Sequence, residues 1–313
     1  MPIVEHAPNM PRNHKKKLKV CILTTFLLSS IILITLIPIA AMNRDPNNGA
    51  TFNPIKNPVS EMQNEVQSTP LLSQPEPLTL TCALARAYET DDEFYNQVLS
   101  LFLASPESGA SVYRAIRYAR GDGNCFYRCV SFRLYELMLQ DLVFGQHTLM
   151  IMQNTIRPRM HQQFGEGSMD FCFIAEGIAQ RICNGELYTV DMVYEAVVNR
   201  EKADYLILYF RYALSIYLRD HADEFVPFVM GLGFSSVEQY CETEVEPLSK
   251  ESDNVEVRAF GQLFDVTIQV EAMYPKAGKL TTIQVGSVQG KNAHPPSIIY
   301  LLLQPGHYDL LES

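Results

Sequence analysis

The sequence predicts an α+β fold with a mostly helical front half and a small C-terminal β-sheet. Apolar residues recur at helical spacing between residues 92 and 230, and near the C-terminus they alternate at strand spacing. The chain has 313 residues, of which 47 % are hydrophobic, including 16 Phe and 16 Tyr. That is enough for a sizeable core. We expect the folded domain to span residues 81–313.

The helices are predicted in order along the chain. In residues 92–104, apolar side chains share one face behind acidic residues, which suit the positive end of a helix. The next helix begins at Cys125, because apolar side chains recur from there at steps of three or four. Further helical stretches are expected at 146–163, 170–182, 189–199, 203–219 and 221–230.

The strands are predicted after a last short helix, which Ser252 and Asp253 would cap. From Val266 to Ala272, apolar and polar residues alternate, which indicates a half-buried strand. A continuous apolar run at 297–303 predicts another strand. Gln304-Pro305-Gly306 then supplies a turn, and His307 to Leu311 forms the returning strand.

The first 80 residues are expected to lie outside this domain. Residues 1–19 form a short basic tail. Residues 20–42 carry no charge over 23 positions, which exceeds the roughly 20 apolar residues that a transmembrane helix needs. The alternative is a cleaved signal peptide, although the run is long for one. Residues 43–80 are rich in proline and polar residues and are expected to form a flexible linker.

These segments predict a single-pass membrane protein that contacts the lipid bilayer through residues 20–42. Basic residues precede that stretch and only Arg44 follows it closely, so the positive-inside rule places the domain on the luminal or extracellular side. The seven cysteines form no CxxC pair and no zinc motif, and free thiols suit a reducing compartment such as the cytosol. The side of the membrane therefore stays open.

The charge balance excludes one class of partner. Residues 1–80 carry seven of the 25 basic and five of the 35 acidic residues, which leaves 18 basic and 30 acidic residues in 81–313, a net charge of −12. A domain with this charge repels the phosphate backbone. We therefore expect no nucleic-acid partner.

The sequence Gly-Asp-Gly-Asn-Cys at residues 121–125 suggests a cysteine nucleophile. The first turn of a helix lowers the pKa of a cysteine, and glycines permit a tight turn whose N–H groups can bind an oxyanion. Asp122 would cap the helix or fix this loop. The alternative is an ordinary turn followed by a buried cysteine.

His307 and Asp309 favour the catalytic interpretation. Residues i and i+2 of a strand lie on the same face, so Asp309 can accept a hydrogen bond from one ring nitrogen of His307 and leave the other to face a thiol. An isolated His-x-Asp pair is a weak signal, and it gains weight here from Cys125.

These motifs resemble those of the otubains, OTU-type cysteine peptidases that cleave ubiquitin conjugates. The resemblance implies a papain-like OTU fold in which Cys125 is the nucleophile, His307 the general base and Asp309 its orienting acid, with Asp122 supporting the oxyanion loop and no cofactor. It covers nearly all of residues 85–313, including the segments 203–211, 244–253, 264–273 and 303–311.

Two features depart from the family pattern. Otubains usually have Pro where this chain has Gly121 and Ala where it has Cys129, but neither change removes a catalytic group. The hydrophobic stretch at 20–42 is the larger departure.

The expected function is that of a deubiquitinase, which cleaves isopeptide bonds between ubiquitin and lysine by a Cys-His-Asp triad. Its partners would be ubiquitin or polyubiquitin chains and ubiquitin-conjugating enzymes. Two alternatives remain at this point: a non-catalytic ubiquitin-binding regulator of conjugation, and a luminal or secreted cysteine hydrolase with another substrate.

Overall fold

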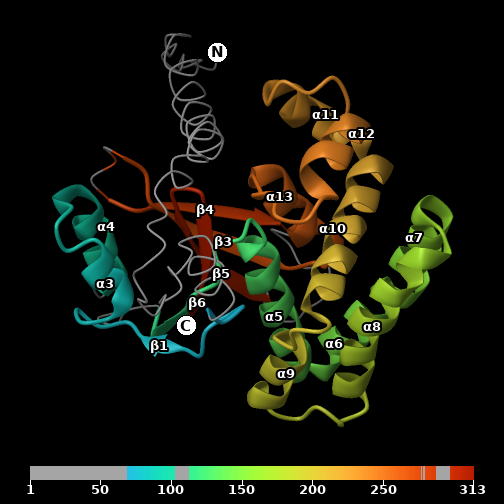
Figure 1. The fold of residues 1–313 in the computed structure, drawn as a ribbon, viewed down its shortest axis with the longest axis horizontal. Coiled ribbons are helices and arrows are strands. Elements are labelled where there is room, and N and C mark those ends of the chain that lie inside the picture. The colour runs from blue at the N-terminus through green and yellow to red at the C-terminus, as the bar shows by residue number, and fades with distance from the viewer. Residues whose placement is uncertain (1–68, 103–112, 276, 278, 287–296) are drawn as a thin grey trace, which may run out of the picture. The chain divides into compact units, whose positions relative to one another are not determined.

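The computed structural model describes residues 69–102, 113–275, 277, 279–286 and 297–313 (Figure 1). The chain divides into two units, Met1–Pro58 and Val59–Ser313, and all described residues belong to the second. This unit places its helices mainly before residue 264 and most of its strands after residue 266, which confirms the α+β class.

The helices follow the predicted order. The stretch expected as one helix over 146–163 begins in one α-helix and ends in another, with a π-helix at Ile151–Ile156 between them. The helices that the sequence did not predict are two α-helices, a 3-10 helix at Glu166–Ser168 and a π-helix at Cys241–Val245. They are only three to five residues long, too short for apolar periodicity to show. The α-helices are α3 (Ala83–Ala87), α4 (Asp92–Phe102), α5 (Cys125–Gln140), α6 (Leu142–Met150), α7 (Arg157–Phe164), α8 (Met169–Cys183), α9 (Val190–Val197), α10 (Ala203–Asp220), α11 (Ala222–Gly231), α12 (Val237–Tyr240) and α13 (Asn254–Leu263).

The strands form one sheet in the order β1-β2-β6-β5-β3-β4. β3 and β5 run parallel, and the other neighbouring pairs are antiparallel. The sequence did not predict β1 and β2, which have two and three residues, or β4, which has no fully buried residue and so lacks an apolar face. The strands are β1 (Glu76–Pro77), β2 (Ala115–Arg117), β3 (Thr267–Ala272), β4 (Thr281–Gly286), β5 (Ile298–Gln304) and β6 (His307–Glu312).

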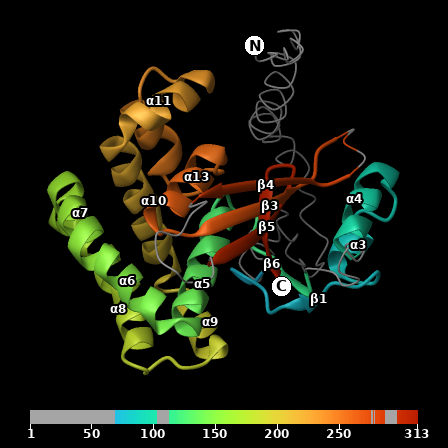
Figure 2. The same ribbon diagram turned by 180° about the vertical axis from the view of Figure 1, so that it is seen from behind.

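Helices cover both faces of this sheet. Figures 1 and 2 show α3 and α4 on one side and α5, α10 and α13 on the other. Successive residues of β5 confirm the two faces, because Leu301 belongs to the larger core around α5 whereas Leu302 belongs to the smaller core with Leu84 of α3. The first turn of α5 contacts β6 through the edge-on rings of Phe126 and Tyr308, whose centroids are 5.6 Å apart. This packing brings Cys125 to the strand that carries His307.

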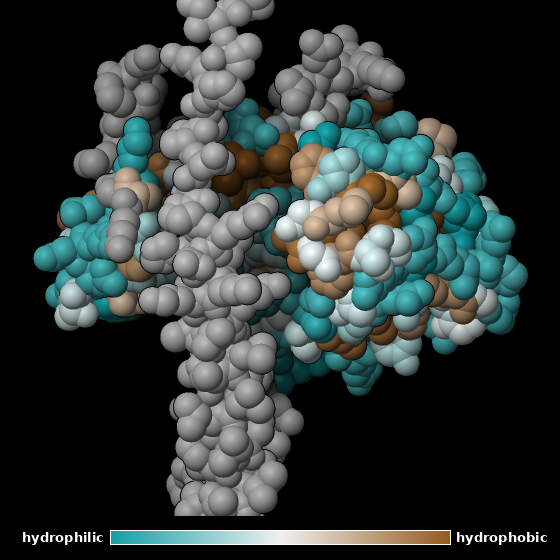
Figure 3. Space-filling view, turned by 90° about the horizontal axis from the view of Figure 1, so that it is seen from above, coloured by the Kyte–Doolittle hydropathy of each residue, from teal (hydrophilic) through white to brown (hydrophobic). Residues whose placement is uncertain are grey.

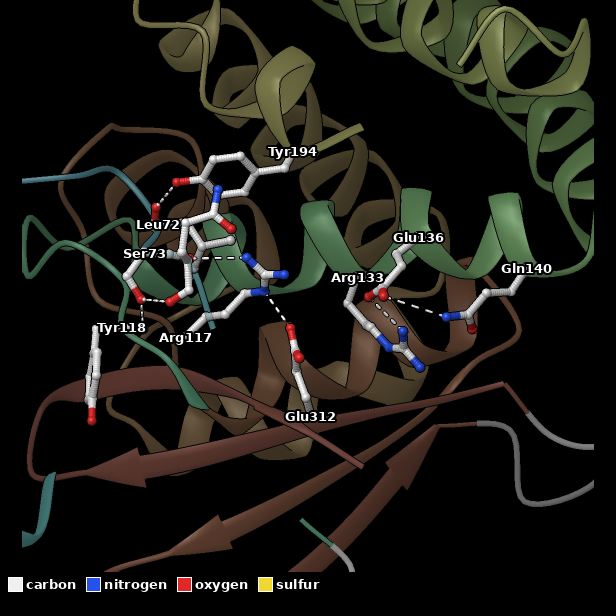
Figure 4. Close-up of polar contacts among 10 residues, drawn as sticks. Leu72, Ser73, Arg117, Tyr118, Arg133, Glu136, Gln140, Tyr194 and Glu312 are labelled. Atoms are coloured by element: carbon white, nitrogen blue, oxygen red, sulfur yellow. Dashed lines mark hydrogen bonds and ion pairs between the residues drawn. The ribbon is translucent and has the colours of Figure 1, made fainter. Parts of the chain in front are cut away.

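Residues 69–80, which the sequence assigns to the linker, contact the domain (Figure 4). The Tyr194 hydroxyl donates to the Leu72 carbonyl at 2.7 Å, and Arg117 donates to the Ser73 carbonyl at 3.2 Å while it pairs with Glu312. Leu72 is 1 % exposed. The packed part of the chain therefore begins before residue 81.

The membrane prediction requires correction. Residues 20–42 lie outside the described residues, and none of the helices in the described ranges combines the length and the apolar character that crossing a bilayer requires. The family relationship reported below contradicts the predicted single-pass membrane localisation, which we do not retain.

Candidate active site

Cys125 is the first residue of α5 and follows a tight turn. Gly123 has φ +75°, and a Cβ at this position would lie 2.4 Å from the backbone of Ser249, so only glycine fits. The backbone N–H of Tyr308 donates to the Cys125 sulfur at 3.4 Å. The positive end of α5 and this N–H both lie at the Cys125 sulfur.

His307 begins β6 and lies between Cys125 and Asp309. Its Nε2 is 3.0 Å from Asp309 Oδ1. Burial by itself lowers the pKa of His307. Hydrogen bonds with Asp309 and with Cys125 raise it by more than burial lowers it, and the resulting pKa is about 10. The ring is therefore cationic at neutral pH and lies in hydrogen-bond contact with the Cys125 side chain.

Asp309 is 1 % exposed and is surrounded by hydrogen-bond donors. Its Oδ1 accepts from the Ala119 N–H at 2.8 Å as well as from His307, and its Oδ2 accepts from Gln304 Nε2 at 2.6 Å. The Tyr88 hydroxyl in turn donates to Gln304 Oε1 at 2.8 Å. These contacts hold the carboxylate in one orientation, which is what a residue that aligns a histidine requires.

Asp122 stabilises the turn itself. Its Oδ1 accepts from the Asn124 N–H at 3.0 Å, and its other oxygen pairs with Arg128 of α5. Asn124 occupies the cap position of α5 without a side-chain cap bond. Of the two roles that the sequence left open for Asp122, the geometry therefore corresponds to fixing the loop.

The structure brings the four predicted site residues to one place, from the turn, from α5 and from β6. The sequence did not predict the backbone N–H donors or the support of Asp309 by Gln304 and Tyr88. A signal for Gln304 was present: two residues separate it from His307, so a hairpin pairs the two, as β5 and β6 do. Tyr88 lies 216 residues from Gln304, and no local pattern connects them.

A cysteine at a helix N-terminus beside a strand-borne His-Asp pair, on an α+β scaffold, is the arrangement of a papain-like cysteine peptidase. A family model described as Peptidase C65 Otubain matches residues 64–313. The chain belongs to this otubain family of peptidases. Family membership confirms the predicted class of enzyme, a cysteine-type deubiquitinase.

Relatives of known name agree with this family. The chain is 29 % identical over 252 residues to the "Ubiquitin thioesterase otubain-like" of Caenorhabditis elegans, covering 80 % of this chain and 84 % of that protein. It is 30 % identical over 256 residues to the "Ubiquitin thioesterase OTUB1" of Rattus norvegicus, covering 80 % and 86 %.

Solved structures confirm the otubain fold. The ceOTUB1 complex with ubiquitin aldehyde and UBC13~Ub matches with a TM-score of 0.67 and 28 % identity, over 81 % of this chain and 98 % of that one. A complex of h/ceOTUB1 with ubiquitin aldehyde and UBCH5B~Ub matches with a TM-score of 0.66 and 27 % identity, over 81 % and 94 %.

Proposed function

We propose that this protein hydrolyses isopeptide bonds between the C-terminus of ubiquitin and lysine side chains. Cys125 is the nucleophile, His307 the acid and base, Asp309 its orienting carboxylate, and Asp122 the residue that fixes the turn. The main support is the contact of His307 with both Cys125 and Asp309, which gives the imidazolium that a cysteine peptidase needs at neutral pH.

The reaction proceeds through a thioester. The Cys125 thiolate attacks the carbonyl carbon of the isopeptide bond, and the C–N bond breaks as His307 transfers its proton to the departing lysine amine. The neutral imidazole then removes a proton from water, whose oxygen attacks the thioester. Breaking the C–S bond releases the ubiquitin C-terminus as a carboxylic acid, which loses its proton to solvent, and returns the thiolate and the imidazolium. These steps need neither a metal nor an organic cofactor.

The charge and the surface of the domain suit a protein substrate. The net charge of −12 over residues 81–313 favours a basic contact surface. Figure 3 shows a face on which polar residues predominate and apolar patches interrupt them. Several large hydrophobic side chains are exposed, including Phe173 at 81 % and Tyr188 at 70 %. Aromatic side chains exposed in this way are typical of protein contact surfaces.

Labelling with ubiquitin that carries a C-terminal electrophile tests this proposal. We expect one covalent adduct per chain, with the modified peptide containing Cys125, because the ubiquitin tail delivers the electrophile only to the nucleophile. Intact mass and peptide mass spectrometry measure both. The same electrophile without ubiquitin is the control for general thiol reactivity. An adduct on another cysteine, or no adduct at all, would contradict the proposal.

A second candidate role is the binding of ubiquitin-conjugating enzymes. It is supported by the family's solved complexes, in which OTUB1 proteins are combined with UBC13~Ub and UBCH5B~Ub. We expect the Cys125→Ala variant to bind a conjugating enzyme charged with ubiquitin as tightly as the unchanged protein, because binding does not need the thiol. Calorimetry with charged and uncharged enzyme measures this. If neither form binds, the role as a regulator of conjugation is excluded.

A further inference from the structure

Arg211 is a cation buried at the centre of α10, and the mechanism above does not use it. It is 0 % exposed, and burial lowers the pKa of its guanidinium. A buried charge is costly unless strong contacts compensate it. An apolar side chain would fill the same space at lower cost, so the contacts of the guanidinium must explain its presence.

Those contacts connect the turn before Cys125 to the end of the π-helix Cys241–Val245 and to the loop that follows it. Nη2 donates to the Gly123 carbonyl at 3.0 Å and to Asn124 Oδ1 at 2.8 Å. It also lies 2.7 Å from the Lys250 carbonyl, and Nη1 donates to the Val245 carbonyl at 2.9 Å. All four acceptors are neutral oxygens. The positive charge is therefore not cancelled by a hydrogen-bonded carboxylate.

The turn and the loop also touch directly. The Ser249 N–H donates to Asn124 Oδ1 at 3.0 Å, so Asn124 receives a hydrogen bond from the loop and another from Arg211. Gly123 packs on the Ser249 backbone too closely for any side chain. The guanidinium also lies 4.3 Å from the ring centroid of Tyr127, two residues after the nucleophile. Arg211 thus contacts the chain on both sides of Cys125.

We propose that Arg211 is a positioning residue of the active site: it fixes the Gly123–Asn124 turn, and with it the direction of the Cys125 sulfur. The effect on ubiquitin cleavage rests on the proposed function. The effect on the reactivity of Cys125 does not.

Other titratable groups surround Arg211 and affect how far its positive charge is compensated. Tyr127 and Cys125 face it from α5, Asp122 from the turn and Glu256 from α13. Burial raises the pKa of Glu256 to about 7, and the Tyr240 hydroxyl lies 2.9 Å from both oxygens of that carboxyl. Glu256 is thus partly neutral near pH 7 and compensates the Arg211 charge incompletely. His307 approaches Cys125 from β6.

Two substitutions of Arg211 test the proposal, one that keeps the positive charge and one that removes it. Arg211→Lys keeps the charge, but a single ammonium cannot reach acceptors on three segments. We expect kcat for a ubiquitin substrate to fall about 10- to 100-fold, as displaced catalytic groups do, with KM within twofold. Arg211→Gln also removes the charge. In both variants we expect the rate of iodoacetamide alkylation at Cys125, measured at a fixed pH by peptide mass spectrometry, to fall about 10-fold, because the sulfur is no longer held in its direction.

Arg219→Lys is the matched control, because Arg219 lies two turns further along α10 and pairs with Glu246 instead of the turn. Circular dichroism checks folding. If both Arg211 variants fail to fold, Asn124→Ala, which removes one acceptor and leaves the cation, is expected to lower kcat in the same way. Folded variants with unchanged kcat and alkylation would overturn the proposal. Altered alkylation without any ubiquitin cleavage by the unchanged protein would uphold it and reject the proposed function.

Discussion

Replacing Cys125 by alanine is expected to lower kcat/KM for a fluorogenic ubiquitin amide by about 10,000-fold or more, since a covalent mechanism has no substitute for its nucleophile. Cys125 is 3 % exposed and begins α5, so the smaller side chain leaves the helix and the turn in place. The loss is therefore chemical, and the melting temperature should change little.

Cys129→Ala is the control for this experiment. Cys129 lies one turn further along α5, burial raises its pKa, and its thiol donates to the Tyr308 carbonyl at 3.8 Å. We expect its removal to reduce stability by about 1 kcal/mol through a small cavity, with kcat/KM within about threefold of the unchanged enzyme. Residual activity of Cys125→Ala above one-hundredth of that enzyme would refute the assigned nucleophile.

Replacing Asp309 by asparagine is expected to lower kcat/KM by about 1,000-fold, within the range that loss of an aligned acid-base group produces. Oδ1 and Oδ2 of Asp309 accept from Ala119, His307 and Gln304. An amide presents one oxygen and an NH2 group to these donors, so at least one buried donor loses its acceptor, at a cost of about 1–3 kcal/mol. The imidazole then loses both its orientation and its charge partner.

Asp309→Asn is also expected to change how activity and stability depend on pH. The pKa of His307 is raised to about 10, so the imidazolium persists at neutral pH, and activity falls as pH rises through about 10. A raised histidine pKa also stabilises the fold fully below about pH 6.5, and this contribution disappears as pH rises through about 10. In Asp309→Asn the alkaline limb of kcat/KM should move to lower pH, and stability should depend less on pH between 6.5 and 10.

Activity assays and urea unfolding across this pH range measure both effects. Asp220→Asn serves as the control, because Asp220 pairs with Arg159 and takes no part in the Cys125–His307–Asp309 contacts. An alkaline limb that stays in place in Asp309→Asn would show that this carboxylate does not hold the charge on His307.

Much of the fold could be predicted because local patterns reflect burial on one face. The helical periodicity after Cys125 and the capping signal at Asp253 both correspond to helices, and Asp253 and Glu256 form the expected capping box. Strands with one apolar face were found in the same way. β4 was missed because its side chains are exposed or half-buried, which leaves no periodic signal.

The sequence by itself determined which residues form the candidate site. A glycine turn before Cys125, and the spacing of His307 and Asp309 on one strand, were sufficient because turns and strand faces depend on neighbouring residues alone. Only the tertiary structure decided which distant groups support them. Tyr88 holds Gln304, which contacts Asp309, across 216 residues, and Arg211 contacts Gly123 across 88 residues. Such contacts arise when separate elements pack together, and no local pattern records them.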